Sequence, residues 1–359
     1  MVTTTLTQHQ DIGGPAQPLL IVKNLLKHFP LKASLFRRGA AAVQAVDDIS
    51  FDVMKNETLG IVGESGCGKS TTARLLLQLL QQDRGELIFD GQTVGSTQLP
   101  MKSFRRQVQM VFQDSYSSLN PRMTILDTIA FAPIVHGMPP RQAEREALEL
   151  LENVGLDPQR YAGRYPHELS GGQRQRVNIA RAIALKPRLI ILDEAVSALD
   201  KSVEAQVLNL LSDLKKKYNL TFVFISHDLS VIEYLCDRVL VMYLGKVVEL
   251  GATRQVLNTP AHPYTQALLA SVPTTDPDRR TEKAPLAGDP PNPIEPPSGC
   301  RFHPRCSQMI TQCKSNMPLL LAHLPGHQVA CIRVNDRIGQ SVGTAQQESA
   351  DMSVLKGTP

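Results

Sequence analysis

Residues 63–70 read Gly63-Glu64-Ser65-Gly66-Cys67-Gly68-Lys69-Ser70, which matches the Gly-x4-Gly-Lys-Ser/Thr pattern of a phosphate-binding loop in full. The stretch follows a short apolar run, residues 58–62, and precedes residues 70–80, where Leu and Ala recur at helical spacing. Glycines let the backbone wrap closely around a polyphosphate, so that its N–H groups and the start of the helix point at negative oxygens. We therefore assign nucleotide contacts to residues 63–71, ending at Thr71. Lys69 is expected to reach the β- and γ-phosphates, and the Ser70 hydroxyl to ligate Mg²⁺.

The bulk composition excludes several classes of protein. With 359 residues, 42% of them hydrophobic and 20% charged, the chain can bury one sizeable core and a smaller second unit. No apolar run approaches 18 residues, so no segment is expected to span a bilayer. Residues 1–17 are polar and lack the charged-then-apolar pattern of a signal peptide, so we predict a disordered N-terminus and no export. A net charge of only +4, without a basic stripe carrying aromatics, argues against a nucleic-acid partner.

Strand and helix patterns alternate along the chain after the phosphate-binding stretch. Helical periodicity dominates residues 116–170, where 141–154 carry Ala and Leu on one face and charges on the other. Predicted helices then precede predicted strands three times over: 172–185 before 189–192, 203–218 before 221–225, and 231–235 before 238–243. This order predicts an α/β fold with a mostly parallel sheet covered on both faces.

Polar side chains stand at the ends of three predicted strands. Asp193 and Glu194 follow the apolar run 189–192, His227 closes the next strand, and Gln113 ends the run that starts at Val108. Carboxyl ends of parallel strands meet at one edge of the sheet, beside the phosphate-binding loop. We expect Asp193 to hold Mg²⁺, Glu194 to polarise the attacking water and His227 to contact the γ-phosphate. Gln113 would bind Mg²⁺ or that water.

A second phosphate-binding helix start is predicted about 20 residues before Asp193. The pentapeptide is Leu169-Ser170-Gly171-Gly172-Gln173. Ser170 can cap the helix that follows, and the first N–H groups of that helix remain available for an anion.

Together with the phosphate-binding loop and the Asp193-Glu194 pair, this pentapeptide makes the chain resemble the ATP-binding cassette (ABC) ATPases over about residues 19–270. The resemblance implies a P-loop NTPase fold: a RecA-like core sheet, an antiparallel β subdomain and a helical subdomain, followed here by a small Cys-rich C-terminal extension. It also implies that two cassettes sandwich two ATP molecules head to tail. Ser170, Gly171 and Gly172 would then contact the γ-phosphate held by the partner, and Gln173 would belong to the same nucleotide-binding helix start.

The resemblance assigns further roles to single positions. Asp200 ends Ser197-Ala-Leu-Asp200, which matches the family segment that crosses the dimer interface. Phe29, in Lys-His-Phe-Pro, stands where the family places an aromatic ring on adenine, more often tyrosine. The residue after the catalytic glutamate is usually proline, whereas this chain has Ala195.

The C-terminal part of the chain resembles the extension of oligopeptide and dipeptide import ATPases. That resemblance rests on His262-Pro-Tyr-Thr-Gln-Ala-Leu-Leu269, a proline-rich stretch and Cys300-Arg-Phe-His-Pro-Arg-Cys306. It implies a peripheral subunit on the cytoplasmic face of the inner membrane. The implied partners are a second, non-identical ABC ATPase, two transmembrane permease subunits and an extracytoplasmic substrate-binding protein. Relatives that carry nickel, glutathione or antimicrobial peptides share these features, so the transported solute stays open between them and peptides.

Four cysteines cluster near the end of the chain, at positions 300, 306, 313 and 331. Their spacing, C-x5-C-x6-C-x17-C, is neither a zinc-ribbon pattern nor a common ferredoxin pattern. Four thiolates on a short, loop-like unit could hold tetrahedral zinc or a [4Fe–4S] cluster, or no metal. The resemblance favours the cluster, ligated by Cys300, Cys306, Cys313 and Cys331.

These observations divide the chain into five predicted parts. They are a disordered start (1–17), the ABC ATPase domain (18–270, with its helical subdomain at about 115–172), a Pro-rich connector (271–299), the Cys-rich unit (300–335) and a flexible tail (336–359). Two rival functions are weighed against transport. A soluble ABC ATPase acting on DNA or the ribosome would usually carry two cassettes or a long coiled coil, and a catalytically idle scaffold would not need Lys69, Asp193 and Glu194 intact.

Overall fold

The computed structural model describes residues 11–14, 16–31, 41–271 and 288–335. The predicted disordered start, most of the Pro-rich connector and the predicted tail therefore lie largely or wholly outside the described residues. The chain divides into two compact units. The first comprises residues up to Lys27, Val46–Val62 and Lys69–Asp237, and the second comprises His28–Ala45, Gly63–Gly68 and the chain from Arg238 onward.

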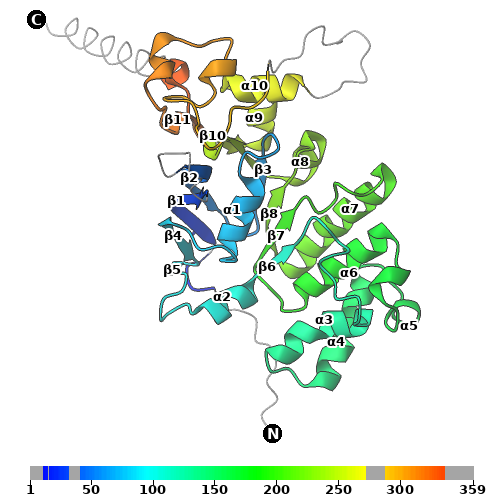
Figure 1. Ribbon diagram of the computed structural model, residues 1–359. Helices are drawn as coiled ribbons and strands as arrows, with labels where there is room; N and C mark the ends of the chain where they lie inside the picture. The colour runs from blue at the N-terminus through cyan, green and yellow to red at the C-terminus, as the bar shows by residue number, and fades with distance from the viewer. Residues whose placement is uncertain (1–10, 15, 32–40, 272–287, 336–359) are drawn as a thin grey trace, which may run out of the picture. The chain divides into compact units, whose positions relative to one another are not determined.

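The core of the first unit is a set of four parallel strands in the order β3-β8-β7-β6 (Figure 1). They are β3 (Thr58–Val62), β8 (Thr221–Ile225), β7 (Leu189–Asp193) and β6 (Val108–Val111). Every residue of β3, β7 and β8 is buried, which is the signature of a sheet covered on both faces. The predicted parallel sheet is confirmed.

Helices connect and cover these strands. They are α1 (Lys69–Leu76), α2 (Met101–Gln107), α6 (Gly171–Ile183), α7 (Lys201–Tyr218) and α8 (Leu229–Leu235). The helix that the sequence extends to residue 80 ends four residues earlier, because Gln78 takes a left-handed conformation with φ = 56°.

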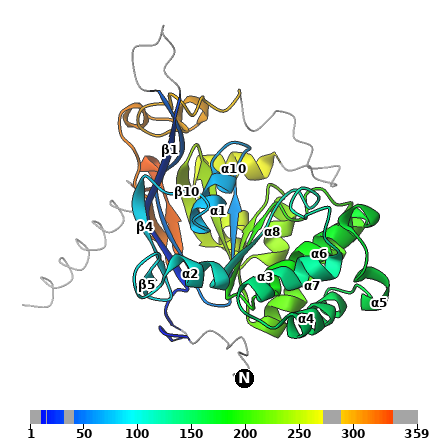
Figure 2. The same cartoon turned by 60° about the horizontal axis from the view of Figure 1, so that its bottom comes forward.

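A helical layer occupies much of the segment for which the sequence predicts helix. It contains α3 (Ile125–Val135), α4 (Pro140–Asn153), α5 (Pro158–Tyr161) and the 3₁₀ turn η1 (Pro166–Glu168). Both α3 and α4 pack against α6 (Figure 2). Ala143, Ala147 and Leu151 of α4 are buried, so the predicted apolar face is the one that packs.

A second sheet is antiparallel and has the strand order β2-β1-β4-β5. Its strands are β1 (Leu20–Pro30), β2 (Ala42–Val53), β4 (Arg84–Phe89) and β5 (Gln92–Thr93). β1 pairs with β4 from Leu20 opposite Phe89 to Leu26 opposite Arg84, with an irregularity after Lys23. This sheet is the antiparallel β subdomain that the family resemblance implies.

Beyond Arg238, the second unit is built on antiparallel strands in the order β9-β10-β12-β11. These are β9 (Arg238–Tyr243), β10 (Lys246–Ala252), β12 (His327–Val329) and β11 (Leu321–Leu324), with α9 (Thr253–Asn258), α10 (Pro263–Ala270) and the turns η3 (His303–Arg305) and η4 (Thr311–Lys314). The Cys-rich unit of the sequence analysis thus contributes two strands to this sheet, which the spacing of its cysteines did not predict.

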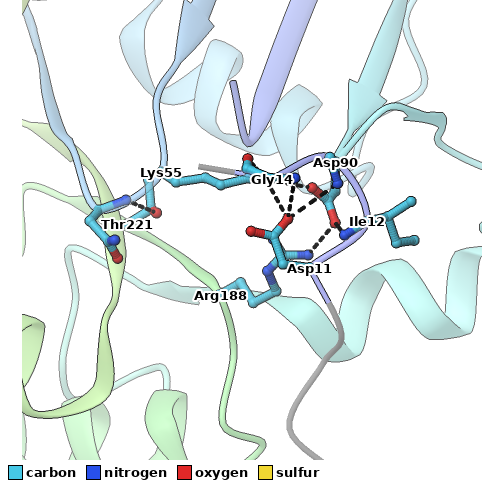
Figure 3. A network of polar contacts seen from close by, with 9 residues as sticks. Asp11, Ile12, Gly14, Lys55, Asp90, Arg188 and Thr221 are labelled. Atoms are coloured by element: carbon cyan, nitrogen blue, oxygen red, sulfur yellow. Dashed lines mark hydrogen bonds and ion pairs between the residues drawn. The ribbon is translucent and has the colours of Figure 1, made fainter. Parts of the chain in front are cut away.

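Charged side chains form a network where the parallel strands of the first unit begin (Figure 3). Asp90, only 3% exposed, pairs with Arg188 at 2.7 Å and with Lys55 at 3.0 Å. Asp11 pairs with Lys55 and, at 3.6 Å, with Arg188. Burial alone would raise the pKa of Asp90, but hydrogen bonds from Arg188, the Ile12 backbone and Lys55 hold it well below its usual range. The network ties the end of β4 to the turn before β3 and to the start of β7.

Among the helices that the structure describes, none is both long enough and apolar enough to cross a membrane.

Candidate functional site

The phosphate-binding stretch has backbone angles that only glycine adopts without strain. Gly68 has φ = 110°, and a Cβ atom there would lie 2.2 Å from the carbonyl oxygen of Ala45. The stretch is closed on itself by a hydrogen bond from the Cys67 N–H to the Glu64 carbonyl, at 3.2 Å. Ser65 and Gly66 are exposed, whereas Cys67 is buried. The loop therefore has the tight, open-faced backbone that a phosphate cradle needs, and Cys67 faces the interior.

Two of the predicted Mg²⁺ ligands meet in the first unit. Ser70, the second residue of α1, donates a hydrogen bond from Oγ to Oδ1 of Asp193 at 3.1 Å. Burial raises the pKa of the Asp193 carboxyl, while Ser70 and the more distant charges of Arg74 and Lys69 oppose that rise. A buried carboxylate beside a hydroxyl, with a lysine nearby, is a donor set that suits a Mg²⁺–phosphate group. Thr71 follows Ser70 in α1 and is half-buried.

Two of the three predicted catalytic residues converge on a carboxylate oxygen of the third, Glu194. Gln113 donates from Nε2 to Oε2 of Glu194 at 2.8 Å, and Nδ1 of His227 lies 3.7 Å from the same oxygen. They come from the loops after β6, β7 and β8, whose carboxyl ends are adjacent because the strands are parallel. His227 is 62% exposed, so its ring can be reached by a ligand.

Glu194 has a strained backbone. Its φ is 48°, a left-handed conformation that is uncommon for a residue other than glycine, and its N–H is fixed by the carbonyl of Ile225 at 3.0 Å. Strained angles held by surrounding structure are frequent where a side chain must be aimed at a ligand. Ala195, which stands in place of the usual proline, is buried directly after it.

The predicted signature pentapeptide forms the start of α6. Ser170 caps the helix by accepting a hydrogen bond from the Gln173 N–H, and the Ser170 N–H in turn donates to Oε1 of Gln173 at 3.0 Å. A Cβ on Gly172 would lie 2.4 Å from Val203, so glycine is required where α6 approaches α7. Gly171 is half-buried and Ser170 is exposed. The helix tip is thus preorganised and open.

Two further predicted positions have contacts of a structural kind. Asp200 caps α7 by accepting a hydrogen bond from the Val203 N–H at 2.9 Å, and this bond lowers the pKa of its carboxyl. Phe29 is half-buried in β1 and belongs to the second unit. Neither the interface role of Asp200 nor the adenine contact of Phe29 is tested by these contacts, and both remain predictions.

The four clustered cysteines share one small cavity in the second unit. Cys300, Cys306, Cys313 and Cys331 all line it, and its volume is about 10 Å³, room for about one water-sized sphere. Burial raises the pKa of Cys300 to about 11 and also raises those of Cys306 and Cys331, so these thiols are protonated at neutral pH when no metal is bound.

The predicted ligation of a metal by these cysteines is not matched by their geometry. In residues 11–14, 16–31, 41–271 and 288–335, no group of three or more His, Cys, Asp or Glu is arranged to hold a metal ion. The four thiols line one cavity, but a polynuclear cluster would require the walls of that 10 Å³ cavity to move apart.

Sequence reasoning missed one group beside the phosphate-binding stretch. The Glu64 carboxylate accepts two hydrogen bonds from Arg305, at 2.8 and 3.1 Å. The two residues are 241 positions apart, so no local pattern could have joined them. Arg305 lies inside the Cys300–Cys306 motif, in which only the two cysteines were predicted to be functional.

Comparisons with known proteins agree with this geometry. Residues 46–197 match the ABC transporter family, and residues 248–313 match the C-terminal region of oligopeptide/dipeptide transporters. The chain is 49% identical to a probable peptide ABC transporter ATP-binding protein of Sinorhizobium fredii, over 87% of this chain and 89% of that protein. It is 48% identical to the oligopeptide transport ATP-binding protein AppF of Bacillus subtilis, over 88% and 97%.

Solved structures give the same answer for the fold. The cbiO1 subunit of a Clostridium perfringens ABC transporter complex aligns with a TM-score of 0.58 and 25% identity, over 67% of this chain and 91% of that one. The ATP-binding cassette MJ0796, a dimer bound to ADP and phosphate, aligns with a TM-score of 0.57 and 28% identity, over 66% and 99%. The site geometry, the two family matches and relatives that cover nearly nine-tenths of the sequence lead to one conclusion: the chain belongs to the ATP-hydrolysing subunits of ABC transporters, in the branch with the oligopeptide/dipeptide C-terminal region.

Proposed function

We propose that this chain binds and hydrolyses MgATP to energise the import of oligopeptides or dipeptides. The observation that carries the catalytic part is the convergence of Gln113 and His227 on the Glu194 carboxylate, one residue after the buried Asp193, which pairs with the half-buried Ser70. Relatives named as peptide transport ATP-binding proteins support the substrate class.

Each residue has a distinct task in this proposal. The backbone of residues 63–68 and the Lys69 ammonium would hold the phosphates, and Ser70 and Asp193 would hold Mg²⁺, which would supply positive charge beside the transferred phosphoryl group. Glu194 accepts a hydrogen bond from the attacking water and orients it for in-line attack. Gln113 fixes the carboxylate of Glu194, and His227 would donate to the γ-phosphate.

The assembly proposed for the chain follows that of its family. A second ABC ATPase would contribute its own signature helix, two permease subunits would receive the motion, and an extracytoplasmic protein would deliver the solute. The complex would lie at the inner membrane, with this chain on the cytoplasmic face. The dimeric state of the cassette MJ0796 supports the pairing of two ATPases. Residues 116–128, which include the exposed Tyr116, would line the groove that docks the permease.

Substitution of Glu194 by Gln tests the catalytic assignment. In the assembled complex, Glu194→Gln should retain ATP affinity and lose ATP turnover on the order of 100-fold or more, because the amide cannot accept the proton or orient the water as a base. Glu86→Gln is the matched control, since the amide oxygen can still accept the hydrogen bond that Thr93 donates to Glu86. Near-normal turnover by Glu194→Gln would reject the assigned base.

Transport assays test the substrate and the class of function. Proteoliposomes that contain the complete complex should accumulate labelled di- or oligopeptide in an ATP-dependent manner. Accumulation of nickel or glutathione, but not peptide, would place the chain with the alternative importers. Turnover that DNA or ribosomes stimulate, without permease subunits in the purified complex, would instead support a soluble ABC ATPase.

We also propose that the four cysteines hold a metal centre, preferably a [4Fe–4S] cluster, with zinc as the alternative. The observation that favours this proposal is the single cavity that all four cysteines line. Such a centre would cross-link loops of the second unit, and no step of ATP hydrolysis depends on it.

Metal analysis of protein purified without oxygen distinguishes the outcomes. About four iron and four sulfide per chain, with a visible absorption band that dithionite bleaches, would support the cluster. One zinc per chain would support the alternative, and neither metal in freshly purified complex would overturn the proposal. Cys313→Ser should lower the metal content, whereas Cys236→Ser, which changes a buried cysteine outside the cavity, should not.

A further inference from the structure

A carboxylate stands on the phosphate-binding loop itself. Glu64 is the second residue of the predicted cradle, five positions before Lys69. Its two carboxylate oxygens each accept a hydrogen bond from the guanidinium of Arg305, at 2.8 and 3.1 Å. The Arg305 side chain is 5% exposed and that of Glu64 is 22% exposed, so this ion pair is largely removed from water. Bidentate pairs of this kind are the strongest and most directional that proteins form.

The backbone of Glu64 is held from the same unit. Its N–H donates to the hydroxyl of Tyr264 at 2.9 Å, and Tyr264 is fully buried in α10. The ring of Tyr264 lies 4.6 Å from that of Tyr243 and 5.4 Å from that of Phe302, between centroids. Aromatic pairs at these separations pack firmly, so the acceptor for the Glu64 N–H has little freedom to move.

Arg305 is fixed by the segment that carries it. Within residues 300–306, Arg301 donates to the carbonyl oxygen of Leu244 and to the side chain of Gln44, and Phe302 joins the aromatic cluster. Arg305 itself also lies 3.4 Å from the hydroxyl of Tyr243. The segment is therefore anchored at Arg301 and Phe302, just before Arg305, and Arg305 itself contacts both Glu64 and Tyr243.

The charge of Glu64 would oppose the ligand that the loop is built to hold. A triphosphate carries three or four negative charges, and an unneutralised carboxylate on the same loop repels it. Arg305 removes this repulsion and holds the Glu64 side chain against the second unit, away from the exposed Ser65 and Gly66.

We propose that Arg305, and with it the segment 300–306, is part of the nucleotide-binding apparatus as a positioning residue for the phosphate-binding loop. It neutralises Glu64 and fixes the loop in its open-faced conformation, so the C-terminal region supports ATP affinity. The inference rests on the proposed binding of ATP by residues 63–70, and it concerns the loop alone.

Nucleotide titrations of the full-length chain test this role. With a fluorescent ATP analogue and Mg²⁺, Arg305→Ala should bind at least 10-fold more weakly than the unsubstituted protein. Arg333→Ala is the matched control in the same region, because Arg333 donates to the Gln308 carbonyl and should leave affinity unchanged. Lysine at position 305 keeps the charge but loses the bidentate geometry, and should give an intermediate loss.

The decisive measurement is a double substitution. If the loss arises from an unneutralised carboxylate, Glu64→Gln combined with Arg305→Ala should recover most of the affinity that Arg305→Ala loses. A merely structural role for Arg305 would leave the double variant as weak as Arg305→Ala. Thermal unfolding of every variant identifies any that fails to fold. If Arg305→Ala fails to fold, the same comparison is made between Arg305→Lys and Arg305→Lys combined with Glu64→Gln.

The outcomes separate this inference from the proposed function. Failure of the unsubstituted protein to bind the analogue would reject ATP binding itself. Normal binding by the unsubstituted protein and by Arg305→Ala would leave ATP binding intact and overturn the role of Arg305. Equal weakening of Arg305→Ala and the double variant would overturn the electrostatic argument.

Discussion

The carboxylates at the two ends of the parallel strands in the first unit have different partners. Where the strands begin, Asp90 is held by two cations, Lys55 and Arg188, and a hydrogen bond from the Ile12 backbone adds to them (Figure 3). Where they end, the nearest hydrogen-bond partners of Asp193 and Glu194 are a hydroxyl and an amide. A carboxylate matched by cations is satisfied and stabilises the fold. A carboxylate met by neutral groups keeps its charge available for a metal ion or a water molecule.

The largest effect on ATP turnover should follow from removing the Asp193 carboxylate, which lies at the carboxyl end of strand β7. Asp193→Asn weakens the Mg²⁺ site and should lower ATP turnover of the assembled complex on the order of 1,000-fold, which corresponds to about 4 kcal/mol. The measurement is turnover as a function of Mg²⁺ concentration, and the thermal midpoint should change little. A large loss of stability with turnover preserved would show that Asp193 is a structural carboxylate like Asp90.

The opposite result is expected at the amino end. Arg188→Ala leaves a buried carboxylate with one cation fewer and should lower the free energy of unfolding by about 3 kcal/mol. Chemical denaturation measures the change, and turnover per folded molecule should stay normal. Lysine at position 188 is the control, since it restores the charge that faces Asp90 and should recover part of the loss.

The contribution of the Asp90 network to stability should depend on pH. The pKa of Asp90 is lowered in the folded state, so its contribution to stability is present above the ordinary pKa of an aspartate, about 3.9, and is lost as pH falls toward the lowered value. Arg188→Ala makes this pKa less depressed, so the stability gap between it and the unsubstituted protein should narrow below about pH 4. A gap that stays constant with pH would show that Arg188 acts through packing on Phe89 instead of through charge.

Only part of this contrast could be foreseen from the sequence. Asp193, Glu194, Gln113 and His227 were placed together because each follows an apolar strand, and parallel strands end at one edge. The partners of Asp90 could not be foreseen, because Lys55 and Arg188 lie 35 and 98 residues away without any periodic pattern.

The same limit applies to shorter elements and to the second unit. The early end of α1 depends on a single backbone angle at Gln78, which no propensity determines. Strands β11 and β12 have four and three residues, too few for an alternating pattern to stand out. The pairing of Glu64 with Arg305 depends on how the C-terminal segment folds back. Motifs thus predicted the chemistry at the strand ends, while long-range charge pairing needed the structure.

A moderate effect is expected from His227, at the carboxyl end again. His227→Ala removes a ring that lies 3.7 Å from Glu194 and is mostly exposed, so turnover should fall about 10-fold with little change in stability. Glutamine at this position can still donate to a phosphate and should retain more activity than alanine. Unchanged turnover in both variants would remove His227 from the catalytic group and leave it an exposed residue of the loop.

The smallest effect is expected from Thr221, which makes an uncharged hydrogen bond at the amino ends of the strands. The comparison of the two strand ends assigns this residue a purely structural role. Thr221 begins β8, is 1% exposed, and its hydroxyl accepts a hydrogen bond from the Asn56 N–H at 2.9 Å. Thr221→Val keeps the shape but leaves that N–H without its acceptor, so the free energy of unfolding should fall by about 1 kcal/mol. Thr221→Ser retains the hydroxyl and should lose less. Turnover should be normal in both variants, because the amino ends of the strands have no part in the chemistry. A drop in turnover that exceeds the loss of folded protein would mean that the two ends are coupled, and the division between a structural end and a functional end would fail.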